Sequence, residues 1–122
     1  MKIYSHSLQG LRKSNEDQHV YFLNREGYNK KINNIDFFGV FDGHGGKIVS
    51  KFLSSAVPKY FSKKIDNDVY TNSKSSSKLF NFVFNDVQEK LIKKHPKAVN
   101  WCGSTALCGI IANHNKYDKR IL

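Results

Sequence analysis

Short apolar runs, bounded by polar or glycine-containing stretches, open the chain. Residues 2–9 alternate in part between apolar and polar positions, and Gly10 ends this run. Residues 18–24 (QHVYFLN) and 35–41 (IDFFGVF) are rich in β-branched and aromatic residues and have the length of strands. The pattern therefore predicts that these segments form a small antiparallel unit, strand by strand.

From Lys47 onward the apolar spacing changes to that of an α-helix. Two neighbouring rows recur every four residues, and they consist of Ile48, Phe52, Ala56 and Tyr60, and of Val49, Leu53, Val57 and Phe61. Pro58 should kink or end this helix, because proline has no N–H to donate to the helical hydrogen-bond ladder. Residues 66–77 are polar and low in complexity, which predicts a surface loop.

A second amphipathic helix is predicted after this loop. Ser75 to Ser77 can cap its start, and Pro96 lies just past its end. Lys93 and Lys94 in its last turn suit the negative end of the helix dipole. The apolar face consists of Phe80, Val83, Phe84, Val87 and Leu91.

The C-terminal part of the chain predicts a hairpin. Residues 106–112 (ALCGIIA) have a strand pattern, residues 113–116 resemble a turn, and residues 117–122 would begin a returning strand. Strands, then two helices, then strands indicate the α+β class, with layered antiparallel β-sheets flanked by helices. The short returning strand leaves an exposed sheet edge, which predicts association with a partner or with a second copy.

Length and composition indicate one folded domain. With 122 residues, 39% of them hydrophobic, the chain is long enough for one core and too short for two. The formal net charge is +10, but the lysines are scattered, which favours a solvated basic surface. The sequence contains no motif that combines aromatic and basic residues, so the charge alone makes nucleic-acid binding a weaker hypothesis than the two functions given below.

The cysteines and the apolar runs indicate where the protein is found. Cys102 and Cys108 match neither a zinc spacing nor a disulfide framework, so we expect reduced core cysteines. The sequence contains no run that resembles a signal peptide and none long enough to span a bilayer. We therefore expect a soluble, cytoplasmic or otherwise intracellular protein that does not bind membranes.

The segment Asp42-Gly43-His44-Gly45-Gly46 is the first candidate site. It lies between a predicted buried strand and the first helix, where the strand holds the carboxylate and the glycines let the backbone approach a ligand. Carboxylate and carbonyl oxygens are the ligands that Mg²⁺ and Mn²⁺ prefer. The alternative is a tight strand-to-helix turn in which Asp42 only caps the helix.

The second candidate site is the polar segment from Arg12 to Asp17. Adjacent acids at Glu16 and Asp17 can hold a metal ion or its waters, and Arg12 can bind a phosphate through two hydrogen bonds. The alternative is a polar loop with incidental charges. A further segment, Gly103-Ser104-Thr105-Ala106, is by itself typical of a packing turn that enters a strand.

Together and in this order, these segments resemble the opening of the protein phosphatase 2C family, the metal-dependent (PPM-type) protein serine/threonine phosphatases. The likeness runs from about residue 5 to about residue 111, and residues 37–46 (FFGVFDGHGG) are its specific part. The resemblance implies part of the family's α-β-β-α sandwich. It also implies metal-dependent hydrolysis of phosphoserine and phosphothreonine in protein substrates.

The resemblance assigns metal-binding roles to four residues. Asp42 matches the carboxylate that bridges two Mn²⁺ or Mg²⁺ ions, and Gly43 matches a residue whose backbone carbonyl is a further ligand. Glu16 and Asp17 match acids that hold metal-bound waters. Such a metal pair lowers the pKa of a bridging water, so that hydroxide attacks phosphorus in line.

The resemblance also assigns two roles toward the substrate. Arg12 matches the arginine that receives the substrate phosphate. His44 matches a residue proposed as general acid for the leaving group, and its ordinary pKa of about 6.5 suits that task. A histidine that only makes a local hydrogen bond at the start of a helix is the alternative for His44.

Members of the family are longer, and their further metal-binding aspartates have no match in this sequence. The remaining aspartates do not fit those positions; they are Asp66, Asp68, Asp86 and Asp118. The resemblance therefore implies a single, incomplete domain over residues 1–122. Two functions stay open: the N-terminal part of an active phosphatase, or a truncated, catalytically inactive protein that binds phosphoprotein or a partner.

Overall fold

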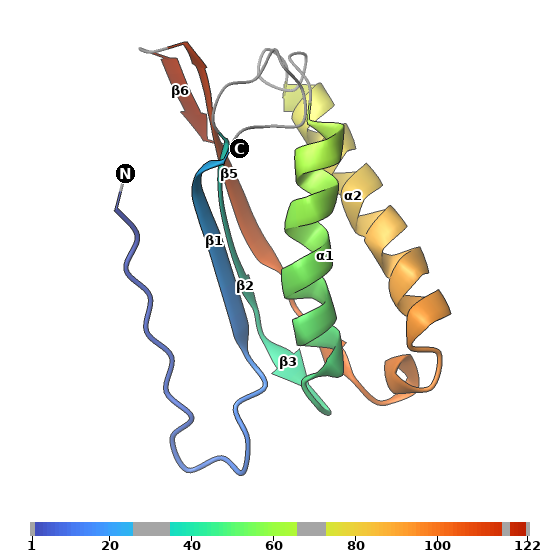
Figure 1. Ribbon diagram of the computed structural model, residues 1–122. Coiled ribbons are helices and arrows are strands. Elements are labelled where there is room, and N and C mark those ends of the chain that lie inside the picture. The colour runs from blue at the N-terminus through green and yellow to red at the C-terminus, as the bar shows by residue number, and fades with distance from the viewer. Residues whose placement is uncertain (1, 26–34, 66–72, 116–117, 122) are drawn as a thin grey trace.

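The computed structural model describes residues 2–25, 35–65, 73–115 and 118–121, and a four-stranded antiparallel sheet forms its main element (Figure 1). The strands lie in the order β1-β2-β5-β6. Their bounds are Gln18–Arg25 for β1, Ile35–Phe41 for β2, Leu107–Asn115 for β5 and Asp118–Ile121 for β6. A second, two-stranded sheet pairs β3 (Gly43–His44) with β4 (Gly103–Ser104).

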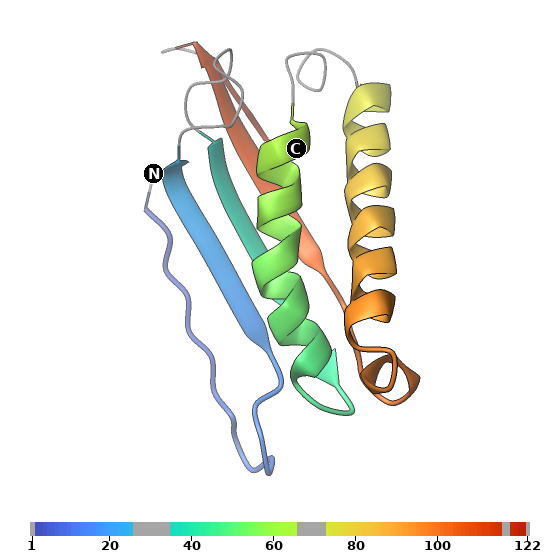
Figure 2. The ribbon, with the colours of Figure 1, turned by 45° about the vertical axis from the view of Figure 1, so that its right-hand side comes forward.

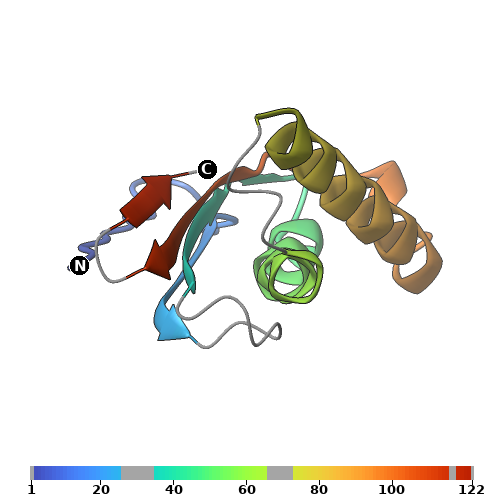
Figure 3. The ribbon, with the colours of Figure 1, turned by 90° about the horizontal axis from the view of Figure 1, so that it is seen from above.

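Two helices cover one face of the larger sheet. Seen from above in Figure 3, α1 (Ile48–Lys64) and α2 (Ser73–Lys94) lie on the same side of the strands. The turned view in Figure 2 shows α2 running alongside α1, and a 3-10 helix, η2 (Ala98–Asn100), follows α2. Within the described ranges, neither helix has the length and apolar character that a membrane crossing requires.

The core lies between the sheet and the helices, and Phe61 of α1 is at its centre. The Phe61 ring centroid is 5.9 Å from that of Phe37 on β2 and 4.8 Å from that of Phe80 on α2. Other fully buried side chains come from every layer and include Phe41, Val57, Val83, Val87 and Ile110. Of the two apolar rows predicted for α1, one is buried in the core and consists of Val49, Leu53, Val57 and Phe61. The other row is only partly buried.

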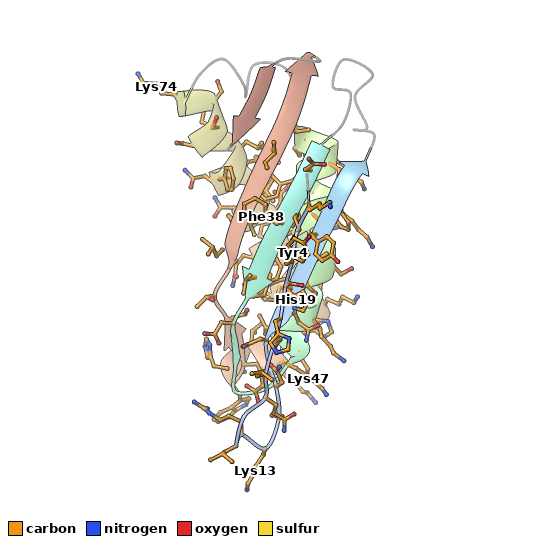
Figure 4. The ribbon with its side chains drawn as sticks, turned by 90° about the vertical axis from the view of Figure 1, so that its left-hand side faces the viewer. Tyr4, Lys13, His19, Phe38, Lys47 and Lys74 are labelled. Atoms are coloured by element: carbon orange, nitrogen blue, oxygen red, sulfur yellow. The ribbon has the colours of Figure 1, made fainter. Side chains whose placement is uncertain are left out.

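The opposite face of the larger sheet carries exposed apolar side chains. Val40 is 49% exposed and Leu107 is 72% exposed. In Figure 4, Tyr4, His19 and Phe38 are seen on this side, and they line a shallow depression of about 390 Å³ between β1, β2 and the N-terminal segment. The part of the chain that the structure describes thus forms two layers, helices on sheet.

The predicted α+β class is confirmed, and so are most of the predicted elements. The strands predicted at residues 18–24 and 35–41 correspond to β1 and β2. The helix predicted from Lys47 is α1, and the apolar face predicted for the second helix is the face that α2 turns toward the core. The returning strand is β6 within the described residues.

The strand expected at residues 2–9 is wrong. This segment is described, but it is in no strand and pairs with no neighbour. Its apolar side chains are exposed, Tyr4 at 87% and Leu8 at 78%. A partly alternating pattern specifies a strand only where one face is buried, and this segment buries neither face.

Pro58 does not end α1, which continues to Lys64. Proline removes one backbone hydrogen bond from a helix, but the loss is offset here because Val57, Pro58 and Phe61 are all buried. Tertiary packing therefore outweighs the local preference of the proline.

The polar loop predicted at residues 66–77 is too long, because α2 begins at Ser73. Residues 66–72 lie outside the described residues. The serines expected to cap the helix, Ser75 to Ser77, lie within it instead. Serine is only a moderate helix former, but the strong apolar face that follows extends the helix backward over it.

The hairpin turn predicted at residues 113–116 is also misplaced, because β5 extends to Asn115. Asn113 pairs with Lys119 and Asn115 with Asp118, with an irregularity between the two pairs. Residues 116 and 117 lie outside the described residues. Asparagine favours turns, but here the pairing with β6 keeps it in the ladder.

Candidate functional site

The loop between β2 and α1 is shaped by contacts that only glycine permits. Gly45 and Gly46 have φ values of +71° and +127°, which side chains rarely adopt. A Cβ on Gly45 would collide with the backbone oxygen of Trp101. The thiol of Cys102 donates to the Gly45 carbonyl at 2.8 Å, so the segment before β4 holds this loop in place.

Asp42 is held through its backbone by Thr105. The Thr105 N–H donates to the Asp42 carbonyl at 2.9 Å, and the Asp42 N–H donates to the Thr105 hydroxyl at 3.3 Å. The pairing of Gly43 with Ser104 continues this contact into the β3–β4 sheet. The Asp42 side chain remains exposed and free to face a ligand. The segment from Gly103 to Thr105, which alone predicted only packing, thus positions the candidate carboxylate.

Glu16 joins the N-terminal segment to the start of α1. Its carboxylate accepts a hydrogen bond from the Gly46 N–H at 3.0 Å and one from the Ser14 hydroxyl at 3.3 Å. Its backbone carbonyl accepts from the fully buried hydroxyl of Ser50 at 2.5 Å. The same carbonyl lies so close to Gly43 that a Cβ on Gly43 would collide with it.

Asp17 lies across from Asp42 at the end of the sheet. The last pair of the β1–β2 register is Gln18 with Phe41, so each aspartate is one residue beyond it. The Asp17 N–H donates to the side-chain oxygen of Asn15 at 3.0 Å, which fixes the turn before β1. Both carboxylates are exposed at the same end of the molecule.

A cleft of about 510 Å³ brings most of the predicted site residues together. It is lined by Leu8, Gln9, Arg12, Lys13, Ser14, Asn15, Glu16, Asp17, Asp42 and Gly43. In Figure 4, Lys13, one of these lining residues, lies at one end of the molecule. Arg12 belongs to a turn in which the Gln9 side chain donates to the Arg12 carbonyl at 2.8 Å. The cleft therefore combines basic groups with three carboxylates.

His44 is the one predicted site residue that does not line this cleft. It follows Gly43 on β3, and its ring lies against the backbone of Gly103 on the paired strand β4. A side chain on Gly103 would collide with the imidazole, which explains the glycine at that position. The histidine is exposed beside the cleft.

The oxygen donors at the cleft are of the type that a hard divalent cation prefers, but they are too few to fill its coordination shell. Asp17 and Asp42 supply exposed carboxylates, and Gly43 supplies a backbone carbonyl at the same cleft. The Glu16 carboxylate is already engaged by Gly46 and Ser14. Within the described ranges, no three His, Cys, Asp or Glu side chains are grouped as a metal would need. Water molecules or further ligands would have to complete a coordination shell of about six oxygens.

Three supporting residues were not singled out in the sequence as site residues. Ser50 holds Glu16, Thr105 holds Asp42, and Cys102 holds the Gly45 loop. The only sequence signal for Ser50 is a polar residue beside the buried row of a helix. Thr105 lies in the segment that supported the family resemblance, although that segment alone indicated only packing. Cys102 carries no local signal, because its partner is distant in the chain.

Comparison with known proteins gives the family. The family profile of protein phosphatase 2C matches residues 1–118. A probable protein phosphatase 2C of Oryza sativa subsp. japonica is 46% identical over 54 residues, which cover 44% of this chain and 13% of that protein. A protein phosphatase 2C homolog of Schizosaccharomyces pombe is 43% identical over 60 residues, which cover 49% of this chain and 14% of that protein.

A third relative is itself short. An uncharacterized protein of Acanthamoeba polyphaga mimivirus is 33% identical over 95 residues, which cover 75% of this chain and 85% of the viral protein. By contrast, the matched segments span only 13% and 14% of the rice and yeast phosphatases. The profile match over nearly the whole sequence shows that this chain belongs to the protein phosphatase 2C family, as an N-terminal portion of it.

Proposed function

We propose that this chain supplies the phosphate-binding residue and part of the metal-binding set for hydrolysis of phosphoserine and phosphothreonine in proteins. Membership of the family supports a protein phosphatase-like domain. The observation that carries the finer proposal is the single cleft lined by Arg12, Asp17, Asp42 and Gly43. The guanidinium of Arg12 can bind a phosphate, and the exposed carboxylates beside it can hold Mg²⁺ or Mn²⁺ next to that phosphate.

In this proposal the carboxylates of Asp17 and Asp42 and the carbonyl of Gly43 hold the divalent ions. When bound, the ions supply an activated water near neutral pH and offset the charge of the phosphoryl oxygens. Thr105 keeps the Asp42 backbone in position. Glu16 contributes mainly by holding the N-terminal segment against Gly46, with its remaining lone pairs available to metal-bound water.

Arg12 binds and orients the phosphate. Its planar guanidinium can donate two parallel hydrogen bonds to phosphate oxygens, which fixes direction as well as position. The turn from Gln9 to Arg12 contains Gly10 at φ +60° and presents the exposed arginine to the cleft. The guanidinium thereby offsets the negative charge on the phosphoryl oxygens.

His44 donates a proton to the leaving seryl or threonyl oxygen in this proposal. A general acid of this kind contributes about 10²–10⁴ to a rate when the leaving group is a poor one. The ring lies against Gly103 and outside the cleft lining, so the role requires it to turn toward the bound ester. A substrate with a good leaving group does not need this proton.

The test measures Mn²⁺-dependent hydrolysis of a phosphothreonine peptide and of p-nitrophenyl phosphate by the purified chain. Asp42→Asn should abolish both activities, whereas Asp86→Asn on α2, outside the cleft lining, should leave them unchanged. His44→Ala should slow the peptide reaction about a hundredfold and the aryl phosphate reaction far less. Hydrolysis that persists in Asp42→Asn would contradict the proposed site.

A second function is favoured by the small number of metal ligands in the described residues. In it the chain is catalytically inactive and binds phosphoprotein through Arg12. Folded protein without Mn²⁺-dependent turnover, together with phosphopeptide binding that survives a chelator and is lost in Arg12→Ala, would support this function over hydrolysis. Binding retained in Arg12→Ala would exclude it.

A further inference from the structure

A groove lies between α1 and the C-terminal end of α2. Its volume is about 600 Å³, and it is lined by Ile48, Lys51, Phe52, Ser55, Ala56, Lys59, Tyr60, Lys63, Lys90, Lys94 and His95. None of these residues lines the cleft that holds Arg12 and Asp42. An occupant of the groove therefore need not contact any residue that lines the phosphate cleft.

The groove is strongly basic. Lys51, Lys59 and Lys63 lie on α1, and Lys90 and Lys94 face them from α2. The residues that line it, as far as the structure describes them, include no acid. The nearby acids of α2 are already engaged: Glu89 lies 4.0 Å from Lys93, and Asp86 acts on Lys90.

Lys90 is held in its charged form. A hydrogen bond with Tyr60 raises the pKa of this lysine, and Asp86 contributes in the same direction. Its ammonium group lies 5.3 Å from the centre of the Tyr60 ring. A lysine side chain is ordinarily charged at neutral pH, and no described lining residue of the groove is an acid that would offset the charge of its lysines.

An apolar stripe forms the floor of the groove. Ile48, Phe52, Ala56 and Tyr60 recur every four residues along α1, and this row is the one that the core does not bury completely. Ile48 is 46% exposed. From Ile48 to Tyr60 the stripe extends about 18 Å at the rise of an α-helix, which corresponds to about three turns of a second helix laid alongside.

We propose that this groove binds an acidic amphipathic helix of a protein partner. The apolar face of such a helix would cover the stripe from Ile48 to Tyr60. Carboxylates on its two flanks would meet the lysines of α1 on one side and those of α2 on the other. A helix bound in a groove usually makes an apolar contact along its centre, and on each flank its charges meet opposite charges of the groove.

The aromatic residues favour a protein partner over a nucleic acid. Single strands bind by stacking bases on free aromatic faces. Here Lys94 lies 5.7 Å from the centre of the Phe52 ring, His95 packs edge-on against it at 5.7 Å, and Lys90 lies over Tyr60, so these rings offer little free face for stacking. The aliphatic side chains of Ile48 and Ala56 can still contact the apolar face of a helix, whereas a base cannot stack on them. A concave floor between two helices also fits a third helix better than the flat surface of a membrane.

The experiment titrates the purified chain with a fluorescent 18-residue peptide that carries leucines on one helical face and glutamates on its flanks. A scrambled peptide of the same composition reports on charge alone. Oligo-dT and vesicles containing phosphatidylserine serve as the competing classes of ligand. Fluorescence anisotropy gives the affinity for the peptides and the DNA, and co-sedimentation gives binding to the vesicles.

The variant Lys59→Glu/Lys63→Glu removes positive charge from the groove, and Lys2→Glu/Lys78→Glu makes the same change in net charge elsewhere. All four lysines are exposed, so both proteins should fold, as circular dichroism would confirm. We expect the groove variant to bind the amphipathic peptide about tenfold more weakly and the matched control to change less than about twofold. The scrambled peptide should bind at least tenfold more weakly than the amphipathic one.

Three results would overturn the proposal. Equal weakening in both double variants would mean that net charge, not the groove, attracts the peptide. Equal affinity for the scrambled peptide would mean that the apolar stripe makes no contribution. Tighter binding of oligo-dT or of vesicles, lost in the groove variant, would assign the same groove to nucleic acid or to a membrane instead.

Discussion

Two free cysteines lie close together in the sequence, yet their surroundings give them different chemistry. The thiol of Cys102 donates to the Gly45 carbonyl at the surface of the site loop. Cys108 lies on the inner side of β5 and packs against the core. Burial raises the pKa of the Cys108 thiol to about 12, because the thiolate loses its hydration there.

We therefore expect Cys108 to be almost unreactive toward a thiol reagent at pH 8. With a pKa of about 12 rather than 9.0, about a thousandfold less thiolate is present at that pH. Labelling of Cys102→Ser, which keeps only Cys108, should be slow in the folded protein and fast in guanidinium chloride. Because the pKa is raised, reactivity should increase as the pH rises toward 12; fast labelling at pH 8 without denaturant would contradict the burial.

Ser50 provides a second prediction for a single residue. Its buried hydroxyl donates to the Glu16 carbonyl, so Ser50→Ala leaves that carbonyl without this partner. We expect the free energy of unfolding to fall by about 1–3 kcal/mol in urea denaturation. Ser54→Ala is the matched control, because Ser54 is on the same helix and its hydroxyl donates to the Lys51 carbonyl of that helix, not to a distant segment. Its change should stay within about 0.5 kcal/mol.

At the scale of elements, the packing of α1 against both the sheet and α2 accounts for the core. Phe61 contacts rings from both sides, with its centroid 5.9 Å from Phe37 on β2 and 6.2 Å from Phe84 on α2. This position lies just past Pro58, which explains why α1 continues through the proline. Ending the helix there would remove Phe61 from the centre of the core.

Phe61→Ala should therefore lower the free energy of unfolding by about 3–5 kcal/mol, because it leaves a cavity among several rings. Phe82→Ala on α2 is the control, since Phe82 is 45% exposed and contacts Lys64 through a cation–π interaction with the ammonium 4.6 Å from the ring. We expect the control to lower the stability by no more than about 1 kcal/mol. Chemical denaturation measures both; similar losses would show that Phe61 is not the centre of the core.

At the scale of the whole molecule, the candidate site joins a folded core to an extended N-terminal segment. In Figure 1 this segment runs alongside the sheet and returns at the end where β3 lies. Its apolar residues are largely exposed, with Leu11 fully so. The segment carries Arg12, whereas Asp42 lies between β2 and β3.

Deletion of residues 2–13 should consequently separate binding from folding. We expect the free energy of unfolding to change by less than about 1 kcal/mol, because few buried contacts are lost. Phosphopeptide affinity should fall as far as it does in full-length Arg12→Ala. Loss of the cooperative unfolding transition in the shortened chain would show instead that the segment is part of the core.

The sequence by itself determined the elements and the chemical character of the site. The period of apolar residues specified β1, β2 and both helices, because burial on one face is encoded at short range. The segment from Asp42 to Gly46 likewise marked a carboxylate on a glycine-rich turn. Boundaries failed where contacts override local preference, as at Pro58, at Ser75 to Ser77 and at Asn113.

Only the tertiary structure decided which residues support the site and which surfaces remain open. The hydrogen bond from Ser50 to Glu16 joins residues 34 positions apart, and the one from Asp42 to Thr105 spans 63 positions. Such contacts depend on strand register and helix docking, which no local pattern contains. For the same reason only the structure shows His44 against Gly103 and the lysines of two helices around one groove.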